Sequence, residues 1–360
     1  ITGYVPRNMA EWTGNIYREK IFQHALDAVK ARPQLSEVNC LTYKEILVLG
    51  KNSPALRPTM YDFLVYRSID ILNTISRYNK QEPITNKQLL FAPVKEFVQM
   101  PIEVKKMDAY SNTLKLYQSL LQSEIAAERT DAILISDLDR LEYANNIIGL
   151  SQNDSLYIQS LEQLSQQYSK NPYKVEILYK LAQYYYQGNY ISSNRDPQKA
   201  LDICNNGIRQ FPKYFRIDVL KQLAKEITQT TVSYSINPNV YPGHKQEVNL
   251  SFKNLSEISI SLYKITESTL EYLNLNKRVP KLEKISTHTY RLPKRLDSQD
   301  TILRLPVPNT GRYQLTVSYA NNSKADSSYF SSSRLSTIAR KTGETSYNVL
   351  VCDLISGKPI

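Results

Sequence analysis

Histidine is the side chain on which most general-base and triad chemistry at neutral pH depends, and this chain has three: His24, His244 and His288. A Ser or Cys nucleophile needs such a base within hydrogen-bond reach, with a further group to orient the base. No Ser, Cys or carboxylate motif accompanies any of the three histidines in the sequence. We therefore expect ordinary surface or core histidines, no catalytic residues, and a protein that is not an enzyme.

Paired carboxylates are the second way to build acid–base chemistry, as in glycoside hydrolysis, which uses two of them. The chain offers Asp137 with Asp139, and Glu124 with Glu128. Helix surfaces supply such pairs by chance, and Asp137, Asp139 and Glu142 are interleaved with apolar residues as in an amphipathic helix. We interpret these carboxylates as a solvated helix face.

Cysteine spacing and nucleotide motifs bear on cofactors and metals. Cys40, Cys204 and Cys352 lie more than a hundred residues apart and form no C-x-x-C pair, so neither a zinc site nor a redox dithiol is expected. The sequence has no G-x-G-x-x-G, no P-loop and no H-E-x-x-H. We expect no cofactor and no metal.

Positive charge is the main compositional bias, with 45 Lys and Arg against 34 Asp and Glu and a formal net charge of +11. Residues 1–229 contribute +4 (28 against 24) and residues 230–360 contribute +7 (17 against 10), so the excess is concentrated in the shorter part. The densest local run consists of Lys277, Arg278, Lys281, Lys284, Arg291, Lys294 and Arg295.

This basic run has two interpretations. It is suited to an acidic surface such as lipid headgroups, anionic polysaccharide or another domain, and is therefore a candidate partner surface. It is also typical of a solvated hairpin whose charges oppose edge-to-edge pairing of strands, which is the interpretation we favour. Tyr290 is its one Phe, Tyr or Trp, whereas stacking of nucleic-acid bases uses several aromatic rings. We expect no nucleic-acid partner.

Tyrosine is unusually frequent, with 27 Tyr against 8 Phe and 1 Trp. A tyrosine can bury its ring while its hydroxyl remains in contact with solvent, which suits both helix packing and binding surfaces. In the run Tyr184-Tyr185-Tyr186, three neighbours on one helix cannot all face the same core. We expect Tyr185 to pack inside, and Tyr184 and Tyr186 to be candidates for a partner surface.

The elements that would position these residues change character near residue 230. Before it, apolar residues recur at three- and four-residue spacing, as in Leu114, Tyr117 and Leu121, which predicts amphipathic helices. After it, apolar and polar residues alternate, as in residues 232–236 and 258–262, which predicts half-buried strands. The expected fold is therefore an N-terminal α-helical array followed by an antiparallel, immunoglobulin-like β-sandwich. No apolar run is long enough for a membrane-spanning helix.

A helix-pair repeat is visible before the switch. Counting back from Pro212, Ala200, Cys204 and Gly207 lie where the second helix of a tetratricopeptide repeat has small residues. Leu178, Leu181, Ala182 and Tyr185 fit the first helix if six residues are inserted between 191 and 198. We expect helix pairs of this kind over residues 1–229, clearest in 152–228, a sandwich over 230–336, and linker strands or a truncated further β domain over 337–360.

Residues 231–265 resemble the opening of a macroglobulin-type β-sandwich. In that family a strand leads to a Pro-Gly turn, here Pro242-Gly243, and a second strand ends in an Asn-Leu pair, here Asn254-Leu255. Residues 311–317 resemble its penultimate strand, and 347–360 resemble the start of a following domain of the same type. Residues 57–64 (RPTMYDFL) are similar to a stretch of the helical region that precedes the first macroglobulin domain in several bacterial members.

The chain thus resembles the N-terminal part of a bacterial alpha-2-macroglobulin-like protein. The resemblance implies an exported protein of the periplasm or cell surface, anchored by lipid through a segment outside this chain, in which a bait segment is cleaved and the body closes on the protease. Its expected partners are other domains of the same protein, proteases and cell-envelope proteins. Many members carry a Cys-x-x-Gln thioester, but Cys40, Cys204 and Cys352 lack the Gln. This chain would then be noncatalytic scaffold.

Two other functions are compatible with the same residues. A free-standing adaptor would use the helical array to bind a peptide or protein, with the sandwich as an accessory. An enzyme such as a glycan hydrolase ranks last, because the residues above provide no nucleophile with a base.

Overall fold

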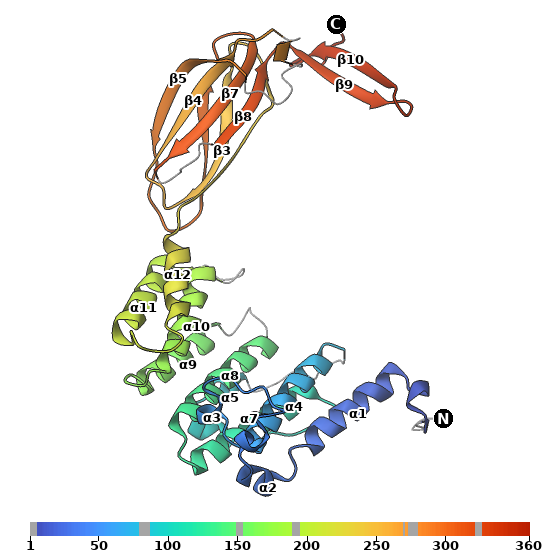
Figure 1. Cartoon of the computed structure of the whole chain (residues 1–360), viewed down its shortest axis with the longest axis vertical. Coiled ribbons are helices and arrows are strands. Elements are labelled where there is room, and N and C mark those ends of the chain that lie inside the picture. The colour runs from blue at the N-terminus through green and yellow to red at the C-terminus, as the bar shows by residue number, and fades with distance from the viewer. Residues whose placement is uncertain are drawn as a thin grey trace. The chain divides into compact units, whose positions relative to one another are not determined.

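The structure, a computed structural model, describes residues 6–78, 87–148, 154–188, 195–268, 271–272, 280–320 and 326–360. The chain divides into two compact units, Ile1–Ala224 and Lys225–Ile360. The first is built from helices and the second mainly from strands, which confirms the expected order of α then β (Figure 1). Among the described helices, none has the length and apolar character needed to cross a membrane.

The helices pack around α4, α7 and α8, where Leu72, Leu120 and Leu121 are fully buried. In chain order the described helices are α1 (Gly14–Asp27), α2 (Arg32–Glu37), α3 (Ser53–Leu56), α4 (Met60–Ser76), α5 (Lys87–Leu90), α6 (Val94–Phe97), α7 (Ala109–Ala126), α8 (Thr130–Ile148), α9 (Asp154–Gln167), α10 (Lys174–Gln187), α11 (Pro197–Gln210) and α12 (Asp218–Thr228), with 3₁₀ turns at Met9–Glu11 and Cys40–Tyr43.

Helix α4 begins with a reciprocal cap that the local sequence specifies. Thr59 Oγ1 accepts a hydrogen bond from the Asp62 amide, and the Asp62 carboxylate accepts one from the Thr59 amide. The same carboxylate is fully buried and accepts hydrogen bonds from Arg129 Nη1 and Nη2, at 2.5 and 3.0 Å. One such cap stabilises a protein by about 1 kcal/mol. The cap and the ion pair together fix where the chain enters α4, three residues after Arg57.

Charged side chains between the helices are buried, and the expectation of a solvated face was wrong for them. Asp137 is 3% exposed and Glu124 is fully buried. Arg140, also fully buried, donates to the Asp137 carboxylate and to the carbonyl oxygens of Leu90 and Ala92. Leu90 lies 50 residues away in the sequence, so local periodicity could not show that these charges have buried partners.

Helices α10 and α11 approach each other through small residues. Ala200 is fully buried and Leu181 is 4% exposed, as expected of packing residues. A Cβ added to Gly207 would lie 2.5 Å from Leu220 Cδ1 and 3.0 Å from Leu178 Cδ1. The absence of a side chain at position 207 is therefore what allows this packing.

The strands form two facing sheets and a separate hairpin. In chain order they are β1 (Thr231–Ile236), β2 (Asn239–Val240), β3 (Lys245–Lys253), β4 (Glu257–Ile265), β5 (Leu282–Arg291), β6 (Gln299–Pro306), β7 (Gly311–Tyr319), β8 (Asp326–Ser332), β9 (Leu335–Lys341) and β10 (Tyr347–Asp353). One sheet has the order β1-β3-β6 and the other β2-β8-β7-β4-β5, antiparallel except for β2 beside β8. Strand β9 pairs only with β10 among the described strands.

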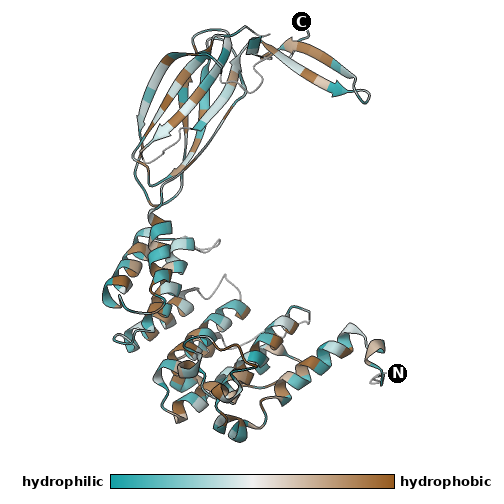
Figure 2. Cartoon of the chain, viewed as in Figure 1, coloured by the Kyte–Doolittle hydropathy of each residue, from teal (hydrophilic) through white to brown (hydrophobic). Residues whose placement is uncertain are grey.

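One buried cluster joins the two facing sheets, which makes them a sandwich. Leu250 on β3, Ile260 on β4 and Leu315 on β7 all belong to this cluster and are at most 2% exposed. Apolar and hydrophilic residues alternate along several of the strands, as expected for sheets with one buried face (Figure 2).

The turns quoted for the macroglobulin resemblance have special backbone geometry. Gly243 has φ +83° and lies in a turn that the His244 amide closes by donating to the Tyr241 carbonyl. Asn254, directly after β3, has φ +54°, in the left-handed region that Asn tolerates better than most residues. Leu255 then enters the core, at 4% exposure.

Four strands differ from the sequence expectation. Strand β5 begins at Leu282, whereas the alternation of apolar and polar residues predicts a strand only from Ser286. Strands β2, β8 and β9 are not predicted by the sequence pattern, and β9 begins at Leu335, one residue before the expected end of the sandwich region at residue 336. The sequence of β8, DSSYFSS, has five polar residues out of seven, so its strand character depends on pairing with β7.

Candidate binding groove

Two adjoining hollows in the helical unit share the side chains of Arg57, Asp139 and Glu142. The first, of about 460 Å³, is lined by residues of α3, α8, α10 and the segment 214–216; we call it the α10 hollow. The second, of about 340 Å³, is lined by α4, α7 and α8; we call it the α4 hollow. The three shared side chains border both hollows, and we call the two hollows together the groove.

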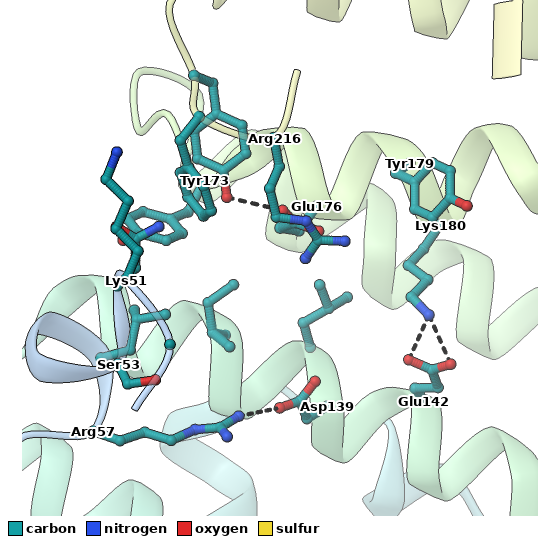
Figure 3. A pocket seen from close by; sticks show the side chains of 17 residues that line it. Lys51, Ser53, Arg57, Asp139, Glu142, Tyr173, Glu176, Tyr179, Lys180 and Arg216 are labelled. Carbon is teal, nitrogen blue, oxygen red and sulfur yellow. Dashed lines mark hydrogen bonds and ion pairs between the residues drawn. The ribbon is translucent and has the colours of Figure 1, made fainter. Parts of the chain in front are cut away.

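Arg57 lies over an aromatic ring where the two hollows adjoin. Its guanidinium carbon lies 3.2 Å from the centre of the Tyr66 ring. Its nearest acid is Asp139, with 3.6 Å between Arg57 Nη2 and Asp139 Oδ2, a distance of ion pairing but too long for a hydrogen bond (Figure 3). No hydrogen bond from this guanidinium is found to any described residue. The ring contact restrains the guanidinium, and its N–H donors remain available.

Asp139 lies at the floor of the groove and accepts a hydrogen bond of 2.9 Å from the Tyr66 hydroxyl. The protein surrounding the carboxyl group removes most of its hydration and raises the pKa of Asp139 to about 6, against the opposing effect of Arg57. Near pH 6 a substantial fraction of this group is therefore neutral.

The Tyr66 hydroxyl also connects the groove floor to a buried acid. It lies 3.1 Å from Ser136 Oγ, which in turn lies 2.8 Å from Glu124 Oε1. Burial raises the pKa of Glu124 to about 8, so this side chain is largely protonated at neutral pH. Four oxygen-bearing groups, those of Asp139, Tyr66, Ser136 and Glu124, thus form one continuous chain.

Ion pairs close the other walls of the α10 hollow (Figure 3). Lys180 on α10 lies 2.7 Å from each carboxylate oxygen of Glu142 on α8. Glu176 accepts a hydrogen bond of 2.9 Å from the Tyr214 hydroxyl and lies 3.2 Å from Arg216 Nη1. These contacts bring together elements that are distant in sequence.

An aromatic cluster forms one side of the same hollow. The ring centres of Tyr173 and Tyr214 are 5.6 Å apart, and those of Tyr214 and Phe215 are 4.6 Å apart. Phe215 is 49% exposed although it is apolar, which leaves part of its ring free for a contact from outside. The hollow therefore combines an apolar side with a charged floor.

The α10 hollow is lined by four cationic side chains and three carboxylates. Lys180, Arg216 and Arg57 each face one acid, while Lys51, on the turn before α3, has no ion-pair partner in the described part of the chain. The groove is lined by none of the three histidines. In the part of the chain that the structure describes, no group of three or more His, Cys, Asp or Glu is arranged to hold a metal ion. The charged and aromatic side chains of the α10 hollow are suited to binding a ligand that has both charged and apolar groups.

The sequence-predicted partner residues lie elsewhere. Lys277 and Arg278 are outside the described residues. The rest of the basic run is exposed on or near β5, the outermost strand of its sheet: Lys281, Lys284, Arg291, Lys294 and Arg295.

Tyr184 and Tyr186, also predicted for a partner surface, are half-buried on α10 and line neither hollow. Tyr184 packs against the helical core, with its ring centre 5.5 Å from that of Tyr185. The groove is not visible in the sequence because its walls come from six segments: α3 with the turn before it, α4, α7, α8, α10 and residues 214–216. The one signal was Arg57, which lies in the stretch quoted for the family resemblance.

Comparisons with known proteins give weak similarity. No protein-family model matches the chain, and no curated protein matches it. Among solved structures, native alpha-2-macroglobulin from Escherichia coli, spanning domains MG0-NIE-MG1, is similar with a TM-score of 0.31 and 14% identity. The match covers 37% of this chain and 48% of that chain, so this chain spans less than half of that structure.

Proposed function

We propose that the chain is the noncatalytic scaffold portion of a bacterial alpha-2-macroglobulin-like protein that traps proteases. The observation that carries the proposal is the sandwich itself. Its Pro242-Gly243 turn and its Asn254-Leu255 pair lie at the strand connections where the macroglobulin resemblance expects them.

The helical unit supports the same proposal through the stretch of residues 57–64. In this stretch Thr59 and Asp62 cap α4, Asp62 pairs with Arg129, and Tyr61 is 2% exposed. Each of these roles is structural, as expected of a region that supports other domains. The proposal includes export to the periplasm or cell surface and the absence of hydrolytic activity in this chain.

The test uses the complete product of the reading frame that contains the chain. After incubation with an active protease such as trypsin, size-exclusion chromatography should show the protease co-eluting with the cleaved protein. Residues 1–360 alone serve as the control and should leave the protease at its own elution volume. A protease that elutes alone from both mixtures would contradict the proposal.

An adaptor that binds a peptide or protein is the second candidate, and the groove around Arg57 is the observation that favours it. The length of the reading frame separates the two. Continuation into several further sandwiches of about 100 residues each supports the scaffold. A stop soon after Ile360 supports the adaptor.

A further inference from the structure

The groove at Arg57 has unused binding capacity at its centre. A guanidinium has five N–H donors in a plane, and this geometry matches a carboxylate that accepts two parallel hydrogen bonds. Arg57 donates none of them to a described residue, and its only acid, Asp139, is 3.6 Å away. The contact with the Tyr66 ring restrains the Arg57 side chain before a ligand binds, which lowers the entropic cost of binding.

The surroundings favour a polypeptide over a free anion. The α10 hollow and the α4 hollow both border Arg57, so a ligand bound there has room to continue in both directions. Phe215, 49% exposed, offers an apolar contact in the α10 hollow. Lys51 adds a cation that has no ion-pair partner among the described residues. A small inorganic anion would contact the cationic side chains but would leave the exposed ring of Phe215 without a contact.

The two hollows on either side of Arg57 also distinguish a C-terminal carboxylate from the side chain of an internal Asp or Glu. A C-terminal carboxylate ends the chain and would fill one hollow only. An Asp or Glu within a segment has residues on both sides, which fit the two hollows. We propose that the groove binds an extended polypeptide segment, with an internal acidic side chain paired to Arg57 and an apolar side chain against Phe215. This inference goes beyond the scaffold function and does not rest on it.

The test is selection from a phage-displayed library of random twelve-residue peptides on residues 1–360. Enrichment of sequences with Asp or Glu within a few positions of an aromatic or aliphatic residue is expected. The most enriched peptide is then synthesised with blocked ends, together with a counterpart in which its acid is replaced by the amide, and titrated calorimetrically. The acidic peptide should bind at least about tenfold more tightly than the amide, because hydrogen bonds between two charged groups are stronger than those to a neutral amide.

Variants assign the effect to the groove. Arg57→Gln should weaken the acidic peptide about tenfold or more and leave the amide counterpart unchanged, whereas Arg57→Lys, which keeps the charge but not the planar fork, should lie between. Arg209→Gln, an exposed arginine on α11 outside both hollows, is the matched control and should bind normally. Thermal unfolding midpoints within a few degrees of wild type would establish that the variants fold.

Three results would overturn the inference: selection without acidic enrichment, equal affinity of the acidic and amide peptides, or equal binding by wild type and a folded Arg57→Gln. A preference for a free C-terminus over an internal acid would overturn the two-sided placement. None of these outcomes depends on protease trapping, so the scaffold proposal is tested separately.

Discussion

At the scale of single residues, the hydrogen-bonded chain from Asp139 to Glu124 raises the question of which groups carry protons. Three contacts join the four groups of Asp139, Tyr66, Ser136 and Glu124. The Tyr66 hydroxyl donates to Asp139, and the Ser136 hydroxyl donates to Glu124 Oε1. Burial raises the pKa of Glu124 to about 8, so the buried end of the chain also holds a proton at neutral pH.

Glu124→Gln tests this proton directly. Glu124 ionises near pH 4.5 when unfolded and near 8 when folded, so the folded protein retains the proton longer. The contribution of Glu124 to the free energy of unfolding is therefore fully present below pH 4.5. It falls as pH rises toward 8 and then levels off. The variant, which has a neutral amide, should gain stability relative to wild type across that window, by at most about 1.4 kcal/mol per pH unit.

Urea unfolding at pH 5, 7 and 9 measures the difference between the two proteins. Glu128→Gln, at an exposed position four residues away, is the matched control and should show a much smaller change with pH. A free-energy difference between Glu124→Gln and wild type that stays constant from pH 5 to 9 would show that Glu124 is ionised throughout.

At the scale of elements, the spacing of apolar residues correctly predicted helices that bury one face. The stripe of Leu114, Tyr117 and Leu121 indicated a helix, and those side chains are at most 5% exposed on α7. Strand β8 escaped prediction because most of its residues are polar and its pairing with β7 is not encoded locally. Asp137 was misread because, although its partner Arg140 is local, the helix pattern does not show that Arg140 also donates to the carbonyl oxygens of Leu90 and Ala92 inside the core.

Packing between α10 and α11 gives the prediction at this scale. Leu181→Ala removes a buried side chain and should cost about 2–5 kcal/mol, and Ala200→Leu overfills a fully buried position and should cost about 1–3 kcal/mol. Tyr186→Ala, at a half-buried position on α10, should cost less than Leu181→Ala. Chemical denaturation of the three variants is the measurement; unchanged midpoints for Leu181→Ala and Ala200→Leu with a large loss for Tyr186→Ala would show that the helix faces are misassigned.

At the scale of the whole molecule, the order of helices and strands followed from the sequence, whereas the groove did not. The change of period near residue 230 is a local property, and α12 ends at Thr228 just before β1 begins at Thr231. The groove needs Arg57, Asp139, Lys180 and Arg216 in one place, and only tertiary packing brings these positions together. Motif reasoning found Arg57 through a resemblance but could not assign it a ligand.

The proposal of a protease-trapping scaffold is tested most directly by comparing protease activity on two substrates. The complete product of the reading frame is mixed with trypsin, and cleavage of a short chromogenic peptide and of a protein such as casein is followed in parallel. Trapping predicts that peptide cleavage continues while casein cleavage is lost, because the enclosed protease stays active but large substrates cannot reach it. Residues 1–360 alone should change neither rate. Equal rates with and without the complete protein, or equal loss of both activities, would contradict the account.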